Sequence, residues 1–502
     1  MSSASSYASS HGAMASKLRT LALGSKPHIN ILLNDERSSY STLDKLSGKV
    51  EIAVSHSTRF EEIDIQFIGT TKTFLEKMSS TPGLTGGMSA FHQFLKLRQP
   101  ISESSYPQPR ILEPGRTYEF PFVFVVPQQL LPRVCRHEVH HESVRDCHLQ
   151  LPPSLGTVTK HDDMGPDMAK IQYQIAARIT AASEIDGIPK ELAKRMKTIR
   201  IVPTVDEQPP VNVLGPDSDY ILRAEKNVKK GVFKGKLGTL VIEAEQPRSL
   251  RLPKSYEPEE STVSTMVTLK LRFDPSDAKS QPPRLGSLGS KLKTSTWYAV
   301  GARMAVPKKK DSVYDHRQGM HSMSMSLSSR CMASVEWTLR RESALEDEWL
   351  ARRDSGLSNH ELPKYPSPST NYKGHNFWTA EIVVPVALPK DKHFVPTFHS
   401  CLVSRTYSLN LSLGIHSAGV GFPSVDLKLP LQISAEGEGE VDGLSRSASA
   451  VEERLAELGL TDELLSAEHR GSWSNNDLET PEFTDLPPEY EVYRRPIVTA
   501  AG

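Results

Sequence analysis

Cysteine and histidine side chains, which are the usual protein ligands of zinc, are concentrated in one short segment of this chain. The segment contains Cys135, His137, His140, His141, Cys147 and His148. Zinc sites that can be recognised from sequence have ligand pairs at short, regular spacings, such as Cys-x-x-Cys. The present spacing matches neither such a pair nor a closed zinc finger, so it favours a polar loop over a metal site. We therefore expect no metal and no cofactor.

The motifs of common enzyme classes are not found in the sequence. It has no phosphate-binding P-loop, no Gly-x-Ser-x-Gly turn of a serine hydrolase and no His-Glu-x-x-His helix of a zinc peptidase. A carbohydrate-binding or enzymatic β-sandwich would need an aromatic-lined acidic cleft, which the sequence does not indicate. We therefore expect a protein that is not an enzyme.

A peptide-binding motif lies close to the end of the sequence, where Pro487, Pro488, Glu489 and Tyr490 form Pro-Pro-x-Tyr. The two prolines hold the backbone close to polyproline II, so an aromatic groove can bind them at little cost in conformational entropy. Tyr490 can then fill a second pocket. This is the ligand pattern of WW domains, whose best-known carriers are ubiquitin ligases of the HECT class. The polar, acidic surroundings predict that the motif is exposed.

Two serines have an arginine three residues before them, as basophilic kinases prefer. They are Ser343 after Arg340 and Ser449 after Arg446. Ser449 is the better candidate because it lies in the predicted tail, whereas Ser343 adjoins a predicted strand. A phosphate at Ser449 would add about −1.5 to −2 charges.

A strip of lysines, Lys229, Lys230, Lys234 and Lys236, could contact anionic lipid, as could the lysines at 308–310. A solvated loop face is the favoured interpretation of both runs. Over the whole chain, 60 basic and 60 acidic side chains cancel, which argues against nucleic acid as the main partner.

The composition of the 502-residue chain, with 37% hydrophobic residues, fits two ordinary domains with additional polar segments. Four scattered cysteines do not form the disulfide framework of a secreted protein, so we expect a cytoplasmic location. No stretch approaches the roughly 18 apolar residues of a membrane span. Any contact with a membrane is therefore expected to be peripheral.

Strict alternation of apolar and polar residues recurs along most of the chain and predicts strands with one buried face. Runs of this kind begin at Val50, Ile63, Phe120, Ile171, Leu240, Val267, Tyr407 and Val425. No helical pattern competes with them in strength. Strands that follow one another without intervening helices favour antiparallel sheets. The sequence therefore predicts an all-β fold of two tandem antiparallel β-sandwiches.

The alternation fades around residues 204–218, where we place a linker between the two sandwiches. The predicted organisation is a disordered segment at 1–26, a first lobe at 27–203, the linker at 204–218, a second lobe at 219–434, and a disordered tail with a short amphipathic helix at 435–502. Four polar insertions are predicted to be loops. They cover residues 79–105, 137–167, 275–290 and 308–330.

Several of these segments resemble the arrestin fold, in its alpha-arrestin branch and nearest its Bul-like fungal members. The similar segments are Ser-Gly-Lys-Val-Glu-Ile at 47–52, Ile-Asp-Ile-Gln-Phe-Ile-Gly at 63–69, the strand entry at 114–122, Leu-Pro-Pro-Ser-Leu-Gly at 151–156, Ile-Gln-Tyr-Gln-Ile at 171–175 and Arg-Thr-Tyr-Ser-Leu at 405–409. The resemblance spans roughly residues 27–434, and it is more specific in the first lobe.

The resemblance implies an adaptor that recruits a WW-domain ubiquitin ligase to plasma-membrane transporters or receptors, which are then ubiquitinated and internalised. Pro487, Pro488 and Tyr490 match the ligase-binding motif of the family, although many members carry more than one copy. Cytosolic tails of membrane proteins would be the cargo. An alternative is a trafficking scaffold that resembles the arrestin-like subunit of retromer and acts without a ligase.

Overall fold

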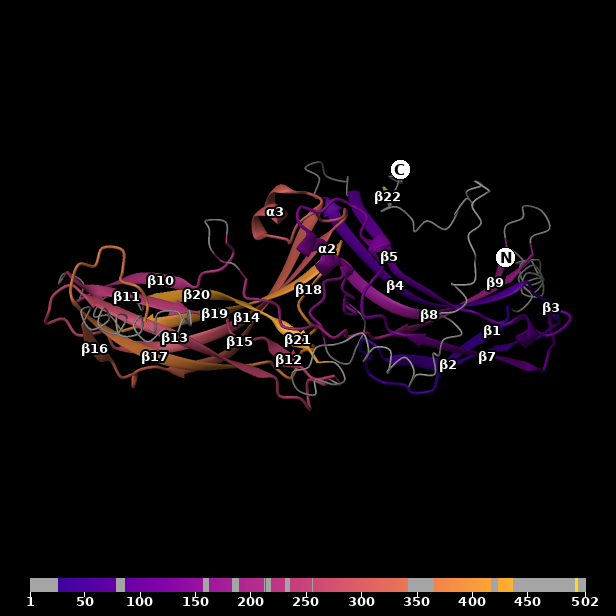
Figure 1. Cartoon of the computed structure of the whole chain (residues 1–502), viewed down its shortest axis with the longest axis horizontal. Helices are drawn as coiled ribbons and strands as arrows, with labels where there is room; N and C mark the ends of the chain where they lie inside the picture. Colours follow the sequence, from indigo (N-terminus) through magenta and orange to yellow (C-terminus); the bar gives the residue numbers. More distant parts are fainter. Residues whose placement is uncertain are drawn as a thin grey trace, which may run out of the picture.

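The computed structural model describes residues 26–77, 86–156, 162–182, 189–211, 213, 218–230, 235–254, 256–341, 365–416, 423–436 and 493–494 of the chain. These residues form two β-rich lobes that lie end to end in an elongated molecule (Figure 1). Almost all strand pairs are antiparallel. The predicted fold class, two tandem antiparallel β-sandwiches of the arrestin type, is confirmed.

The first lobe packs a three-stranded sheet against a five-stranded sheet. The smaller sheet has the order β1 (His28–Leu33), β2 (Lys45–Ala53), β7 (Thr117–Val125). The larger sheet has the order β22 (Tyr493–Arg494), β5 (Gly86–Gln99), β4 (Glu62–Lys77), β8 (Ala169–Ala181), β9 (Lys190–Ile199). A short pair, β3 (Thr58–Arg59) and β6 (Ile111–Leu112), lies beside them.

Aromatic side chains fill much of the space between these two sheets. Strand β7 buries alternate residues, with Phe120 and Phe122 almost fully enclosed. On the inner face of the larger sheet, the ring of Phe67 on β4 stacks on Tyr173 of the neighbouring strand β8, with the ring centroids 5.9 Å apart. The alternation seen in the sequence therefore marks the buried face, because successive side chains of a strand point to opposite faces.

The second lobe also has two large sheets. One has the order β10 (Arg223–Lys229), β11 (Lys236–Ala244), β13 (Ser264–Pro275), β17 (Asn376–Ala387), β16 (Thr338–Arg341). The other has the order β15 (Gln318–Cys331), β14 (Leu285–Ala299), β19 (Val403–Ile415), β18 (Phe398–His399), with β20 (Ser424–Leu431) also paired to β19. A parallel pair, β12 (Leu250–Leu252) and β21 (Ile433–Ala435), completes the lobe.

Three of the predicted loops instead contain long strands, so that part of the prediction is wrong. β5 lies within 79–105, β14 begins within 275–290, and β15 occupies much of 308–330. In β15 the Met and Ser repeats are a period-two pattern, because Met323, Met325 and Leu327 pack against the core while the serines between them are exposed. The fourth insertion, 137–167, contains helix α2 (Glu142–Leu149).

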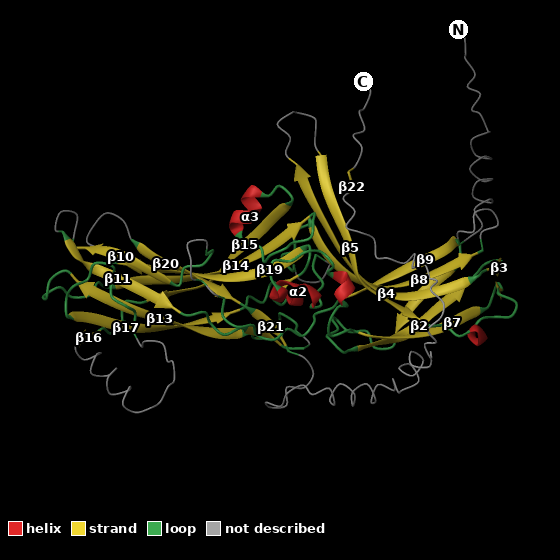
Figure 2. Cartoon of the chain, turned by 45° about the horizontal axis from the view of Figure 1, so that its top comes forward, coloured by secondary structure: helices red, strands yellow, loops and turns green. Residues whose placement is uncertain are grey.

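The two described α-helices, α2 and α3 (Lys309–Tyr314), are short and lie near the middle of the molecule (Figure 2). Helix α2 follows the 3-10 turn η2 (Pro132–Val134), and α3 precedes β15, while a second 3-10 turn, η1 (Glu103–Ser105), lies in the first lobe. Among the residues that the structure describes, no helix is long and apolar enough to cross a membrane.

Candidate functional site at the junction of the lobes

The junction of the lobes is a packed interface. Residues of the second lobe complete the hydrophobic core of the first, and they are Tyr298, Val300, Val395, Phe398, Cys401, Leu402 and Val403. The hydroxyl of Thr73 on β4 also donates a hydrogen bond of 2.7 Å to the carbonyl of Ala299. Apolar burial of this kind is the main stabilising contribution in protein interiors, so the two lobes hold each other in place.

A buried arginine links the lobes at this junction. Arg405 on β19 is fully enclosed and donates to the carbonyl oxygens of Asp163 and Met164, at 3.0 and 3.2 Å. The carboxylate of Asp163 in turn accepts hydrogen bonds from the backbone N–H groups of Gly156 and Gly165. Arg405 therefore fixes a turn of the first lobe against a central strand of the second.

The role of Arg405 was not predicted, although the sequence contained a signal for it. The alternation at Tyr407, Leu409 and Leu411 continues backwards to Arg405, which places an arginine on the buried face of a strand. A buried guanidinium needs hydrogen-bond acceptors. Those acceptors, the carbonyl groups of Asp163 and Met164, lie 242 and 241 residues earlier in the chain.

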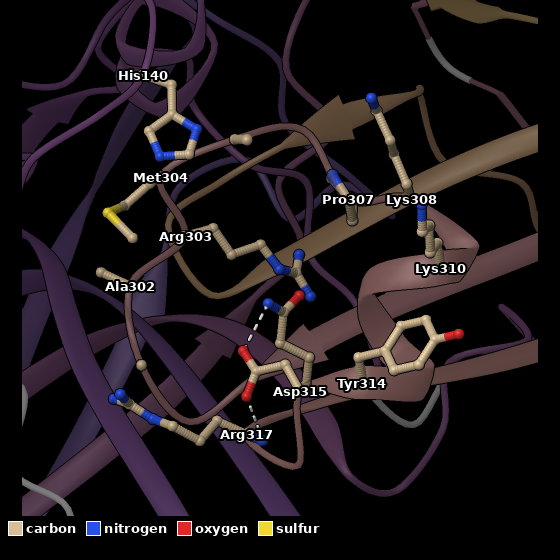
Figure 3. A pocket seen from close by; sticks show the side chains of 13 residues that line it. His140, Ala302, Arg303, Met304, Pro307, Lys308, Lys310, Tyr314, Asp315 and Arg317 are labelled. Atoms are coloured by element: carbon tan, nitrogen blue, oxygen red, sulfur yellow. Dashed lines mark hydrogen bonds between the residues drawn. The ribbon is translucent and has the colours of Figure 1, made fainter. Parts of the chain in front are cut away.

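A basic pocket of about 570 Å³ opens beside the junction. Lys308 and Lys310 lie on one side of it and Arg317 on another, with Asp315 between them and His140 of the first lobe above (Figure 3). The excess of cationic side chains makes the pocket suited to an anionic group.

Arg303 forms part of the wall of this pocket and is 4% exposed. It donates to the hydroxyl of Ser404 at 3.1 Å, and burial lowers its pKa to about 9. Its backbone N–H donates to the carbonyl of Cys401 at 3.0 Å, and the N–H of His140 donates to the carbonyl of Met304 at 2.8 Å. The pocket is thus built from both lobes.

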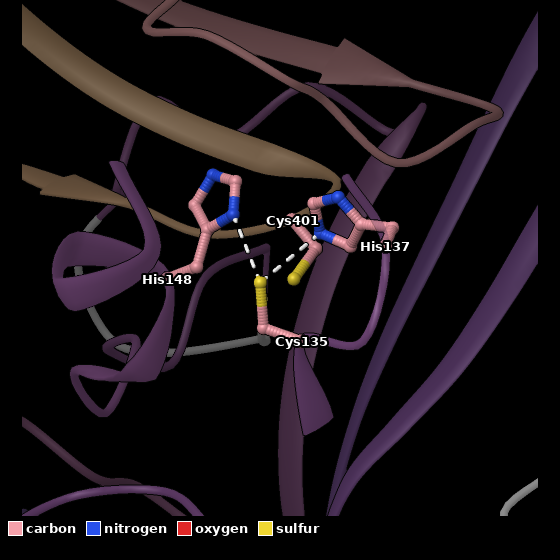
Figure 4. Close-up of side chains that lie close together, drawn as sticks. All are labelled: Cys135, His137, His148 and Cys401. Carbon is pink, nitrogen blue, oxygen red and sulfur yellow. Dashed lines mark hydrogen bonds between the residues drawn. The ribbon is translucent and has the colours of Figure 1, made fainter. Parts of the chain in front are cut away.

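Next to the pocket, four potential metal ligands converge. One ligand atom from each of Cys135, His137, His148 and Cys401 lies within 4.8 Å of all the others. The thiol of Cys135 is 3.3 Å from Nε2 of His137 and 3.6 Å from Nδ1 of His148. Figure 4 shows the four side chains pointing toward one another. Three of the four, all except His137, are buried.

The cluster changes how the segment at 135–148 must be interpreted. It was predicted to be a polar loop, but η2 and α2 order it, and Cys135 and His148 are each 2% exposed. Cys401, the fourth member, comes from the second lobe, so no local spacing could include it. The remaining candidates of the segment lie apart: His140 lines the pocket, and His141 caps α2 by accepting from the N–H of Ser143.

The electrostatic environment of the cluster favours a thiolate at Cys135. Burial tends to lower the pKa of His137, but its hydrogen bonds with the Cys135 thiol and the Glu138 carbonyl outweigh burial, so this pKa is raised. The hydrogen bond with Cys401 is the main influence that lowers the pKa of the Cys135 thiol, and contacts with His137 and His148 act in the same direction against the effect of burial. Burial and the neighbouring His137 lower the pKa of His92 to about 4. By contrast, burial raises the pKa of Cys147, which stands outside the cluster.

Most of the site residues predicted from the sequence lie outside the described residues. These are Pro487, Pro488, Tyr490, Ser449, Ser343 and Lys234. Of the lysine strip, Lys229, Lys230 and Lys236 are exposed at the hairpin between β10 and β11. Lys230 forms an ion pair of 2.6 Å with Asp277. Contact of this strip with a membrane stays a prediction.

A short piece of the tail returns to the first lobe. In β22, Tyr493 pairs with Ser89 and Arg494 with Met88, at the edge of β5. Strand β5 is the next-to-last strand of the larger sheet, and with β4 it projects beside the junction (Figure 2). The edge strand β22 therefore begins three residues after Tyr490 of the Pro-Pro-x-Tyr motif.

A family model described as the Bul1 N terminus matches residues 101–177, which include β7, α2 and much of β8. No curated protein matches the chain. The family match supports a Bul-like, arrestin-related adaptor and agrees with the resemblance found in the first lobe.

Proposed function

We propose that this protein is a non-enzymatic adaptor that recruits a WW-domain ubiquitin ligase of the HECT class to membrane transporters or receptors, which are then ubiquitinated and internalised. The observation that carries the proposal is the combination of an arrestin-like pair of lobes, matched to the Bul1 N terminus at residues 101–177, with a Pro-Pro-x-Tyr motif in the same chain. The protein would act in the cytoplasm and at the plasma membrane or endosomes.

In this proposal the ligase binds at Pro487, Pro488 and Tyr490. The pairing of Tyr493 and Arg494 with β5 supports a position for the motif beside the first lobe. A ligase held there would have a high effective concentration near a cargo bound to the lobes, without any contact between ligase and cargo.

We further propose that the basic pocket receives an acidic part of the cytosolic tail of the cargo. Lys308, Lys310 and Arg317 supply the positive charge, and the pocket opens beside the packed junction, which gives it a firm base. A charged pocket of this kind steers an oppositely charged peptide and increases its rate of association. The exposed lysines Lys229, Lys230 and Lys236 lie on a different hairpin and would contact anionic lipid.

Titration of the full-length protein with isolated WW domains of HECT ligases tests the ligase contact. The wild-type protein should bind at least one domain in the micromolar range, and Tyr490→Ala should abolish this binding because the aromatic pocket is left empty. Tyr493→Ala serves as a matched control, since it removes a nearby tyrosine outside the motif. Lack of binding by the wild-type protein would exclude the ligase adaptor and favour the ligase-independent, retromer-like scaffold.

The cargo contact is tested separately by reversing charge. Lys308→Glu with Lys310→Glu should reduce capture of an acidic cargo tail while leaving WW binding unchanged. The pair Lys229→Glu and Lys230→Glu makes the same change of charge on the other hairpin and is the control. An equal loss of capture in both double variants would contradict the assignment of the pocket.

A further inference from the structure

We propose that Cys135, His137, His148 and Cys401 form a structural zinc site that joins the two lobes. The proposal is independent of the adaptor function, because it concerns how the lobes are held together. Three ligands come from the segment that includes η2 and α2 in the first lobe, and the fourth comes from the turn between β18 and β19 in the second.

The spacing of the ligand atoms fits a tetrahedral ion. With Zn–S near 2.3 Å and Zn–N near 2.0 Å, a tetrahedron has sulfur-to-nitrogen edges of about 3.5 Å. The thiol of Cys135 lies 3.3 Å from Nε2 of His137 and 3.6 Å from Nδ1 of His148, and all four ligand atoms are within 4.8 Å of one another. Only small rotations of the side chains are needed to enclose an ion among them.

The orientation of His137 supports the same arrangement. Its Nδ1 lies 3.0 Å from the carbonyl oxygen of Glu138. A carbonyl can only accept a hydrogen bond, so Nδ1 must carry the proton, and in the neutral ring the lone pair is then on Nε2, the atom that faces Cys135. Metal-binding histidines commonly have this arrangement, in which the second ring nitrogen donates to a backbone carbonyl.

The charge and burial of the cluster favour a closed structural site. Cys135, His148 and Cys401 are each 2% exposed. Two thiolates would neutralise the charge of Zn²⁺, and a neutral complex with four protein ligands is compatible with burial in an apolar core. Because all four positions are filled by the protein, none is left for a water molecule, so the site would have a structural role.

The neighbouring hydrogen bonds show what the ion would hold in place. Cys401 accepts a hydrogen bond from the N–H of Arg303, and the N–H of His140 donates to Met304. His140, Arg303 and Met304 all line the basic pocket. A zinc ion at the cluster would therefore fix both walls of that pocket as well as the contact between α2 and β18.

Metal analysis of the purified full-length protein tests the proposal. We expect about one zinc ion per chain, as for other sites with two cysteines and two histidines. Cys401→Ser should remove most of the metal, whereas Cys147→Ser and Cys331→Ser should retain it, because these two cysteines are not members of the cluster. Far-UV circular dichroism of each variant confirms that the lobes remain folded.

A second measurement uses the wild-type chain and therefore does not depend on the folding of a variant. After removal of zinc with a chelator, added Co²⁺ should produce the visible bands of a tetrahedral cobalt ion and the near-ultraviolet band of thiolate coordination, which the d¹⁰ zinc ion does not give. The chelated protein should also unfold at a lower temperature, and Zn²⁺ should reverse this shift. No bound metal, zinc retained in Cys401→Ser, or a disulfide between Cys135 and Cys401 in the isolated protein would each overturn the proposal.

Discussion

Each lobe has a charged cluster on the outer face of the middle strand of a five-stranded sheet, but the two clusters are covered to very different degrees. On β4 of the first lobe, Asp64 accepts from Arg98 at 3.0 Å and from Arg178 at 3.1 Å. The side chain of Asp64 is 4% exposed, but those of the arginines are 54% and 44% exposed. On β13 of the second lobe, Arg272 and Asp274 are 2% and 1% exposed.

The difference comes from a segment that crosses the second cluster. The guanidinium of Arg272 donates to Asp274 at 2.7 Å and to the carbonyl of Pro366 at 3.3 Å, and it lies 3.7 Å from the ring centroid of Phe377. Asp274 also accepts from the N–H of Ser369 at 2.7 Å. In the first lobe the cluster is a set of cross-strand pairs open to water.

The same kind of ion pair therefore has different consequences for stability in the two lobes. A partly exposed pair is screened by water and contributes little to stability. A covered pair has lost its hydration, so each charge depends on its partner. The hydrogen bonds of the covered pair therefore hold the segment around Pro366 and Ser369 in one position over the sheet.

Removal of one partner from the covered pair should have the largest effect on the free energy of unfolding. Arg272→Ala leaves Asp274 buried without its counter-ion, so we expect the free energy of unfolding of the second lobe to fall by about 3–5 kcal/mol. Urea denaturation followed by tryptophan fluorescence measures this change. Four of the five tryptophans, Trp297, Trp337, Trp349 and Trp378, lie within residues 219–434, and none occurs in residues 27–203. Trp473 belongs to the predicted tail, so between the two lobes the signal distinguishes the second.

The control for this experiment removes both charges. The double variant Arg272→Met with Asp274→Leu should be less destabilised than Arg272→Ala, because no unpaired charge remains in the covered site. If Arg272→Ala lost less than about 1 kcal/mol, the pair would behave like a solvated surface pair. The contrast between the two lobes would then be wrong.

Removal of the shared acceptor from the open cluster of the first lobe should lower the free energy of unfolding by less. Asp64→Ala removes the acceptor that Arg98 and Arg178 share, but both arginines can then be hydrated, so we expect a loss of about 1–2 kcal/mol. Far-UV circular dichroism during urea denaturation measures it. Asp64→Asn keeps an acceptor oxygen and should lose less, and high salt should reduce the effect of Asp64→Ala. A loss as large as that of Arg272→Ala would show that exposure does not govern the difference.

The alternation of apolar and polar residues was enough to predict the two sandwiches, but it did not predict the junction between them. The alternation of Phe120, Phe122 and Phe124 identifies a buried strand face, because its physical cause lies within nine neighbouring residues of β7. The alternation in β15 was also present, but methionines and serines hid it. Cys401 and Arg405 are different. Their partners, Cys135 and Asp163, belong to the other lobe, and only the packing of the lobes brings them together.

An exposed ion pair between the lobes should make the smallest contribution to the free energy of unfolding, and this contribution should depend on pH. Asp162 accepts from Lys392 at 3.0 Å, and its side chain is 51% exposed. Burial tends to raise the pKa of Asp162, but the hydrogen bonds from Lys392 and from the N–H of Met164 outweigh it, so the pKa is lowered. A carboxyl group with a lowered pKa stabilises the folded state above its unfolded pKa of about 4. This contribution is lost as the pH falls through the folded pKa.

The isosteric variant Asp162→Asn isolates this contribution, because the amide oxygen can still accept from the N–H of Met164. At neutral pH the variant should be less stable than the wild type by well under about 1 kcal/mol, since water screens an exposed pair. The difference should begin to shrink below about pH 4 and disappear once the pH is below the lowered folded pKa of Asp162, where the wild-type carboxyl is protonated. Thermal unfolding at several pH values measures both quantities. A stability difference that persisted in acid would show that the charge of Asp162 does not cause it. The decrease of the effect with exposure, from Arg272 through Asp64 to Asp162, would then not hold for this ion pair.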